Sequence, residues 1–149
     1  MRALLQRVTT ASVTVNEAVV GEISQGVLVF LAVQKNDSEA EATKLLNKIF
    51  KYRVFVDQQQ KMNLSVGDIA GGVLIVSQFT LAADTQKGLR PSFSSAAEPQ
   101  FARSLYDFFV RKARAISEQN DVTIATGVFG ADMQVSLVND GPVTFLLES

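Results

Sequence analysis

The chain has 149 residues, of which 47% are hydrophobic and 19% are charged, and its formal net charge is −1. This composition is typical of one folded globular domain and argues against a disordered chain or a strongly basic nucleic-acid-binding protein. The chain contains neither histidine nor cysteine, which excludes Ser-His-Asp and Cys-His catalysis, disulfide bonds and histidine- or cysteine-based zinc sites.

The first segments of the chain predict strands of a sheet. Residues 2–9 and 11–20 alternate in polarity as strands do, and "NEAVVGE" from Asn16 is typical of a turn region. Residues 26–33 form a continuous apolar run, "GVLVFLAV", which predicts a buried strand.

A helix is predicted next, over residues 38–52. Ser38 followed by Glu41 is a capping-box signature at its start. Residues 53–57 predict a short strand, and the polar residues 58–68 predict a loop or hairpin. The apolar stripe of the helix, expected to pack on the sheet, consists of Leu45, Leu46, Ile49 and Phe50.

The second half begins with a predicted strand over residues 71–81. Residues 82–100 form the longest irregular stretch, and loops of that length in compact domains are often functional. A second helix is predicted over residues 98–120, with Phe101, Leu105, Phe108 and Phe109 spaced to face the core. Three strand-like pieces complete the chain, at residues 122–130, 132–140 and 142–149.

These elements predict a single α+β domain over residues 1–149, with a mixed or antiparallel sheet and two helices on one face. GxGxxG and GxxxxGK[ST] patterns are absent, so nothing indicates a nucleotide-binding fold. The acidic residues show no EF-hand spacing or close cluster, and we expect neither a metal nor a cofactor. No apolar run approaches the roughly 18 residues of a membrane helix, and "MRALLQRVTT" lacks the apolar core of a signal peptide. With no cysteine present, we expect a cytoplasmic protein.

The stretch "SQFTL", residues 77–81, is the first candidate for chemistry. Ser77, Gln78 and Thr80 are polar residues at the end of an apolar run. In a regular strand Ser77 and Thr80 would lie on opposite faces, so they share a site only if the strand bends or ends there. Spacing alone favours hydroxyls that satisfy local backbone groups at a strand end.

The stretch "VNDGPVT", residues 138–144, is the second candidate. Asn-Asp-Gly-Pro is typical of a simple hairpin turn. Gly141 would also let carbonyl groups approach a ligand closely, and a cis bond before Pro142 would redirect those carbonyls. Residue types alone favour the turn.

Basic residues supply two further candidates. Lys87 and Arg90 in "KGLRPSF", residues 87–93, could bind phosphate, while Phe93 anchors the loop or stacks on a base. The alternative is a solvated loop with one buried phenylalanine. "RKAR", residues 111–114, is basic too, although most such runs are a solvated helix face.

Taken together, "SQFTL", "KGLRPSF" and "NDGPVT" resemble the D-aminoacyl-tRNA deacylase family, also called D-tyrosyl-tRNA deacylase. The opening "MRALLQRVTTASVTV" and residues 126–145 are similar to it as well, and the resemblance covers essentially the whole chain in order. The chain departs from the family in lacking a glycine in the turn of "VNEAVVGE" and in carrying Ala32 where glycine is common. We expect neither departure to touch the candidate site.

The resemblance implies a homodimer with a barrel-like sheet that hydrolyses the ester of D-aminoacyl-tRNA and also removes glycine from mischarged tRNA. It implies that "SQFTL" lines the site in one subunit, while Gly141 and Pro142 enter from the other with a cis peptide. Their carbonyls would hold the α-ammonium group and leave no room for an L side chain. The partner is then the aminoacylated 3′ end of tRNA, with Lys87 and Arg90 as our candidates for phosphate contacts.

Hydrolysis needs an oxyanion stabiliser and a nucleophile. The Phe79 N–H and the side chains of Ser77 and Gln78 are candidate donors to the ester carbonyl. Thr80 could attack directly, but no histidine exists to take its proton. Water assisted by the ribose 2′-hydroxyl is the alternative that the absence of histidine favours.

Three rival interpretations stay open at this point. A non-catalytic RNA-binding module would bind tRNA without hydrolysis, although the aromatic residues mostly have core spacing. A related deacylase selective for L-aminoacyl esters would carry a trans Gly-Pro bond and a wider pocket. A small dimeric structural protein would bind no ligand at Gly141 or Pro142.

Overall fold

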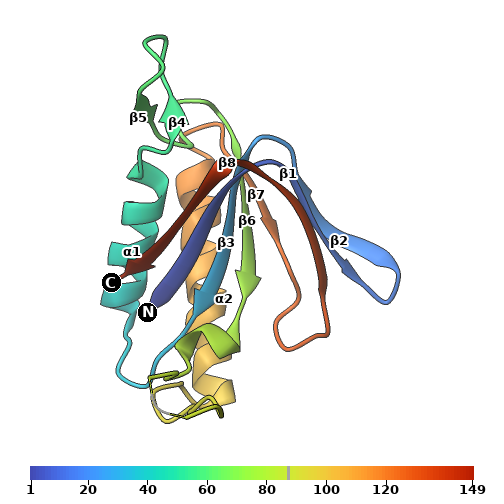
Figure 1. Cartoon of the computed structure of the whole chain (residues 1–149), viewed down its shortest axis with the longest axis vertical. Coiled ribbons are helices and arrows are strands. Elements are labelled where there is room, and N and C mark those ends of the chain that lie inside the picture. The colour runs from blue at the N-terminus through green and yellow to red at the C-terminus, as the bar shows by residue number, and fades with distance from the viewer. Residues whose placement is uncertain (87) are drawn as a thin grey trace.

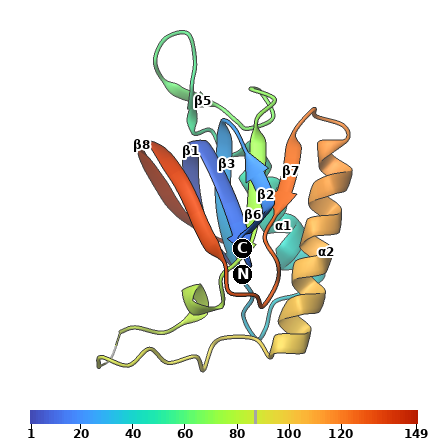
Figure 2. The ribbon, with the colours of Figure 1, turned by 90° about the vertical axis from the view of Figure 1, so that its right-hand side faces the viewer.

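A mixed β-sheet carries two helices on one of its faces in the computed structural model, which describes residues 1–86 and 88–149 (Figures 1 and 2). The α+β class predicted from the sequence is therefore confirmed. The helices are α1 (Glu39–Lys51) and α2 (Pro99–Ser117), and a short 3₁₀ helix, η1, spans Phe79–Ala82. The strands are β1 (Arg2–Val15), β2 (Ala18–Ile23), β3 (Gly26–Ala32), β4 (Phe55–Val56), β5 (Met62–Leu64), β6 (Gly72–Ser77), β7 (Thr123–Thr126) and β8 (Gln134–Glu148).

The main sheet curls until it is nearly barrel-shaped. Its strand order is β2-β1-β3-β6-β7, with β8 paired to β1 as well. The pairs β3–β6 and β6–β7 are parallel, while β1 pairs antiparallel with β2, β3 and β8. The curl brings β2 against β7, where a Cβ atom on Gly21 would lie 2.4 Å from the Thr126 carbonyl oxygen. The backbones can approach this closely because Gly21 has no side chain.

Both faces of the central strands are buried, which explains their continuous apolar sequence. In β3, Val27, Val29 and Leu31 belong to the core beneath the two helices. Leu28, between them, belongs to a second core that lies inside the curl of the sheet, together with Val8, Val13, Leu74 and Val76. The buried strand predicted at residues 26–33 is confirmed.

The two helices cover one face of the sheet, as predicted (Figure 2). The capping box of α1 is present: the Ser38 N–H donates to Glu41 Oε2 at 2.9 Å, and the Ala40 N–H donates to Ser38 Oγ at 3.1 Å. The hydrogen bond from the Ser38 side chain lowers the pKa of Glu41. All four residues of the predicted α1 stripe are buried: Leu45, Leu46, Ile49 and Phe50.

The predicted core face of α2 is wrong at Phe101, whose side chain is 40% exposed. The buried arc of the helix is centred on Ala102, Tyr106, Phe109 and Ala113. Phe101 lies at the margin of that arc, because successive residues of a helix are turned by about 100°.

Several predicted strand boundaries also change. β1 continues through Val15 without a break, and the turn is confined to Asn16 and Glu17, whose φ angles are 49° and 65°. Positive φ at both turn residues is the requirement of a tight hairpin. The last two predicted pieces form one strand, β8, and residues 122–130 contribute only the short β7. Within residues 1–86 and 88–149, no helix is long and apolar enough to cross a membrane.

Candidate functional site

The polar stretch at residues 77–81 lies where β6 ends. Ser77 is the last residue of β6, and the Gln78 N–H donates to the Leu31 carbonyl of neighbouring β3 at 2.8 Å. The chain then turns into η1 at Phe79. The predicted strand through residue 81 is therefore too long, and strand alternation no longer keeps Ser77 and Thr80 apart. The structure brings Ser77, Gln78, Phe79 and Thr80 to the wall of one cavity.

Hydrogen bonds arrange the polar groups of this turn. The Gln78 side-chain amide donates to Thr80 Oγ1 at 2.7 Å. No carboxylate or amine among the described residues contacts the Thr80 hydroxyl closely enough to take its proton. Phe79 is the first residue of η1, where N–H groups lack an acceptor within the helix. The Phe79 ring stacks on Phe93, with 4.7 Å between the ring centroids.

The cavity beside this turn has a volume of about 470 Å³. Its polar groups lie at the end of β6, and its remaining walls are mainly apolar. Helix α2 contributes Pro99, Ala102 and Tyr106, and the segment between β7 and β8 contributes Phe129 and Met133. Ala32, at the end of β3, also lines the cavity, so the expectation that this departure lies away from the site is wrong. The arrangement suits a ligand with one flat apolar part and one polar, reactive end.

Tyr106 lines the cavity and is held in place by a hydrogen bond to β6. Its side chain is buried and its hydroxyl donates to the Ile75 carbonyl of β6 at 3.0 Å. Burial raises the pKa of Tyr106 to about 12, so the phenol is protonated at neutral pH and cannot act as a general base there.

Because of this shift, the free energy of unfolding changes with pH in the alkaline range. Since the pKa of Tyr106 rises from 10.0 to about 12 on folding, its contribution is complete below pH 10 and is lost between those two values. We expect the free energy of unfolding to fall less steeply above pH 10 in Tyr106→Phe than in the unchanged protein. Urea unfolding at a series of alkaline pH values measures this, with Tyr52→Phe as control. Equal slopes in all three proteins would contradict the prediction.

Backbone hydrogen bonds hold the segment between η1 and α2 at several points. Asp84 and Ser92 exchange two backbone hydrogen bonds, of 2.7 and 2.9 Å, and the Ala97 N–H donates to the Val33 carbonyl at 3.2 Å. Arg90 is exposed and does not line the cavity. Lys87, the other predicted phosphate contact, lies outside the described residues.

The Gly-Pro stretch forms a large bulge inside β8 and not a hairpin turn. Thr144 pairs with Gln6 of β1, whereas Asn139 pairs with Val8, so residues 140–143 all lie opposite Arg7. Both halves of β8 run antiparallel to β1, which excludes the simple turn that the residue types favour. The Gly141–Pro142 peptide bond is cis, and Gly141 has a φ of 148°.

Two side chains that sequence reasoning missed hold the bulge. Arg7 is only 8% exposed; it donates to the Asp140 carbonyl at 2.9 Å and to the Val54 carbonyl at 2.6 Å. The Val143 N–H donates to Asn139 Oδ1 at 2.7 Å, so the Asn139 side chain links the two ends of the bulge. One signal was visible in the sequence: Arg7 falls on the same face of its strand as buried Leu5, where an arginine needs a partner.

The two predicted halves of the site do not meet within one chain. Gly141 and Pro142 are exposed, and neither lines the cavity beside Ser77–Thr80. Within the part of the chain that the structure describes, no group of three or more acidic side chains is placed to hold a metal ion.

Comparisons with known proteins agree with these features. A family model described as "D-Tyr-tRNA(Tyr) deacylase" matches residues 4–148. A D-aminoacyl-tRNA deacylase of Pseudoalteromonas translucida (strain TAC 125) is 60% identical over 147 residues, which cover 99% of each chain. Another protein of that name, from Cellvibrio japonicus (strain Ueda107), is 58% identical over 148 residues, again covering 99% of each chain.

Two solved structures have similar folds. One, "c-Myc DNA Unwinding Element Binding Protein", is 39% identical, has a TM-score of 0.92 and matches over 100% of this chain and 99% of its own. The other, described as "Structural Analysis of a probable eukaryotic D-amino acid tRNA deacylase", is 19% identical, with a TM-score of 0.82 and coverage of 99% and 98%. The second likeness concerns the fold alone.

Proposed function

The chain belongs to the D-Tyr-tRNA(Tyr) deacylase family, and from that premise we propose that it hydrolyses the ester of D-aminoacyl-tRNA to tRNA and a free D-amino acid. Residues 1–149 act as one deacylase-like domain, in the cytoplasm, where charged tRNA is found. The observation that carries the proposal is the family match over residues 4–148, together with the polar end of β6 beside an apolar cavity.

The ester lies at the start of η1. Its carbonyl oxygen points to the Phe79 N–H, with the Ser77 hydroxyl and the Gln78 amide as further donors. The terminal nucleoside that carries the ester then occupies the adjoining cavity, where Tyr106 and Phe129 offer aromatic surfaces to the base. Loss of a single oxyanion donor typically slows such a reaction by about 100- to 1,000-fold.

Water is the nucleophile, assisted by the 2′-hydroxyl of the terminal ribose. Thr80 is poorly suited to attack, because its hydroxyl accepts a hydrogen bond from Gln78 and contacts no base among the described residues. An unactivated hydroxyl is a weak nucleophile at neutral pH. Thr80 therefore positions the substrate through its bond to Gln78.

Gly141 and Pro142 select the D configuration. Both residues are exposed, and their carbonyls hold the α-ammonium group of a substrate bound to the partner subunit. An L side chain would collide with these carbonyls, a D side chain points to open space, and glycine has no side chain to reject. The same site therefore also removes glycine mischarged on tRNA(Ala).

A homodimer completes the site. On the sheet face opposite the helices, Leu4 pairs with Phe30 of β3 on one side and with Leu146 of β8 on the other, forming an apolar row across the strands. Leu146 is 55% exposed, and Val138 and Phe79 are exposed as well. Covering this row with a second copy buries it and carries the Gly-Pro bulge to the partner's cavity.

Deacylation of D-tyrosyl-tRNA and of L-tyrosyl-tRNA at equal enzyme concentration tests the proposed function. We expect fast loss of the D ester while the L ester is spared. Loss of both esters would support the hydrolase activity but refute selection of the D configuration by Gly141 and Pro142. Binding of tRNA without loss of either ester would favour a non-catalytic RNA-binding module.

Phosphate contacts outside the cavity need only a small basic patch. Arg90 of the segment between η1 and α2 is exposed, and we retain it, with Lys87, as a candidate contact to tRNA. The formal net charge of −1 is compatible with this, since counterion release depends on local contacts.

A further inference from the structure

Helix α2 carries exposed arginines on the side of the molecule next to the cavity. Arg103 directly follows Ala102, which lines the cavity, and its guanidinium carbon lies 6.0 Å from the ring centroid of Phe129, another lining residue. Arg103 therefore stands at the rim of the cavity. Its exposed charge can contact a group that leaves the cavity on this side.

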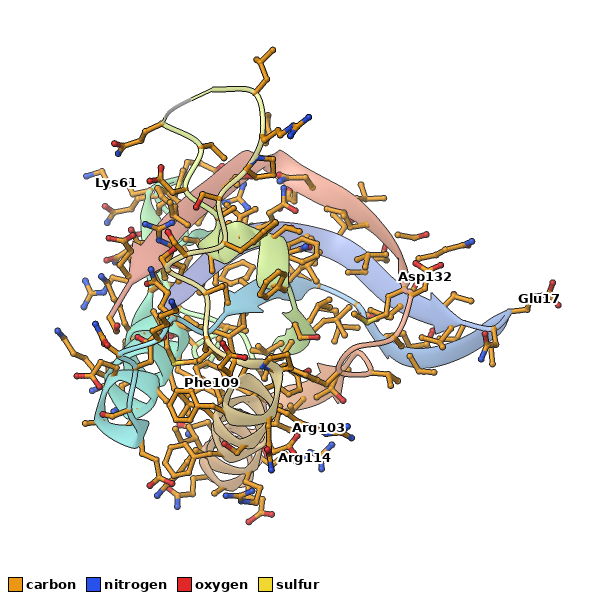
Figure 3. The ribbon with its side chains drawn as sticks, turned by 90° about the horizontal axis from the view of Figure 1, so that it is seen from below. Glu17, Lys61, Arg103, Phe109, Arg114 and Asp132 are labelled. Atoms are coloured by element: carbon orange, nitrogen blue, oxygen red, sulfur yellow. The ribbon has the colours of Figure 1, made fainter. Side chains whose placement is uncertain are left out.

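Arg114 lies on the same side of α2 as Arg103, farther from the rim of the cavity. It follows Arg103 by eleven residues, which at about 100° per residue completes three turns and places both on one face, roughly 16 Å apart along the axis. Figure 3, which looks at α2 from below, shows both side chains on the same side of the helix. Asp107 lies between them in the sequence, yet no ion pair joins it to either arginine among the described residues.

We propose that Arg103 and Arg114, here named the arginine pair, bind backbone phosphates of the tRNA acceptor end as it leaves the cavity. The inference rests on the proposed function, because the terminal nucleoside must occupy the cavity for the chain to pass Arg103. Neither guanidinium group forms an ion pair within residues 1–86 and 88–149, and their spacing suits phosphates of different nucleotides. Each such contact releases counterions. The basic run at residues 111–114 thus contributes Arg114 to binding.

The test compares Arg103→Gln/Arg114→Gln with a matched control, Lys44→Gln/Lys51→Gln, which removes two exposed charges from α1. Each protein is assayed on D-tyrosyl-tRNA and on D-tyrosyl-adenosine, an ester without phosphates, across a range of salt concentrations. Losing two single-strand phosphate contacts should reduce the slope of log(kcat/KM) against log[salt] for tRNA by about 1.4. Between about 50 and 200 mM salt, the ratio of kcat/KM of the unchanged protein to kcat/KM of the arginine-pair variant, measured on tRNA, then falls by about sevenfold.

We expect the arginine-pair variant to lose more on tRNA than on the adenosine ester, and the lysine control to lose on neither. Equal behaviour of the two variants on tRNA would overturn the inference, as would an equal loss on both substrates. If the unchanged protein hydrolyses neither ester, the proposed function fails separately. In that case, the affinity of the same variants for uncharged tRNA still tests whether the arginine pair binds phosphates.

Discussion

Gly141→Ala is expected to lower kcat/KM for D-tyrosyl-tRNA by about 100-fold, because displacing a substrate-positioning group by about 1 Å can cost that much. A Cβ atom at this position would lie 2.6 Å from Val143 Cγ2 and 2.8 Å from the Val143 nitrogen. Val143 is buried, and its N–H is held by Asn139, so the backbone of the bulge must move. The carbonyls of Gly141 and Pro142 move with it, and the preference for D over L esters falls.

The matched control for this change is Gly88→Ala. Gly88 also has a positive φ, of 73°, but a Cβ atom there would meet nothing within 4 Å. Both variants therefore carry alanine in a left-handed region, and only one disturbs the bulge. Steady-state deacylation of D- and L-tyrosyl-tRNA measures the effect, and a thermal unfolding curve of each variant verifies folding. A Gly141→Ala protein as active and as selective as Gly88→Ala would refute the role of the bulge.

Removing the 2′-hydroxyl from the terminal adenosine of D-tyrosyl-tRNA is expected to slow hydrolysis by about 100- to 10,000-fold, the range typical of a positioned proton-transfer group. Thr80→Ala, assayed on the normal substrate, should retain most of its activity. The reason is the same in both cases: Thr80 contacts no base, so the substrate itself must assist the attacking water.

Single-turnover deacylation measures both changes apart from product release. A 2′-deoxy substitution at the preceding cytidine is the control for altered tRNA structure. The opposite pattern, with Thr80→Ala inactive and the 2′-deoxy ester hydrolysed at the normal rate, would refute assistance by the 2′-hydroxyl. An acyl-enzyme trapped on Thr80 would then identify Thr80 as the nucleophile.

Local sequence signals predicted local structure well. The capping residues Ser38 and Glu41 and the apolar run at residues 26–33 depend on neighbours within a few positions, and both predictions are confirmed. The prediction that Phe101 faces the core is wrong, because the direction of a helix's buried arc depends on what packs against it. The strand predicted at residues 71–81 is too long, because the apolar pattern does not reveal that η1 begins at Phe79.

Pairing between distant segments could not be read from the sequence. Asn-Asp-Gly-Pro favours a hairpin turn by residue type, yet both halves of β8 pair with β1, and the four bulged residues face Arg7. An arginine in a strand is a weak signal by itself. Its role becomes visible only when the carbonyls of Val54 and Asp140 are found around its guanidinium group.

The sequence by itself determined which chemistry is open to this protein: without histidine or cysteine, any catalysis must use hydroxyls, amides, backbone groups, carboxylates, lysine or arginine side chains, or the substrate itself. It also determined the family, because the motifs occur together and in order along the chain. Only the tertiary structure decided that Ser77–Thr80 border a cavity with Tyr106 and Phe129, that Arg7 holds the Gly-Pro bulge, and that the bulge lies away from that cavity. Residue types and spacing set local conformation, whereas these features depend on contacts between residues far apart in the chain, which form only when the sheet closes.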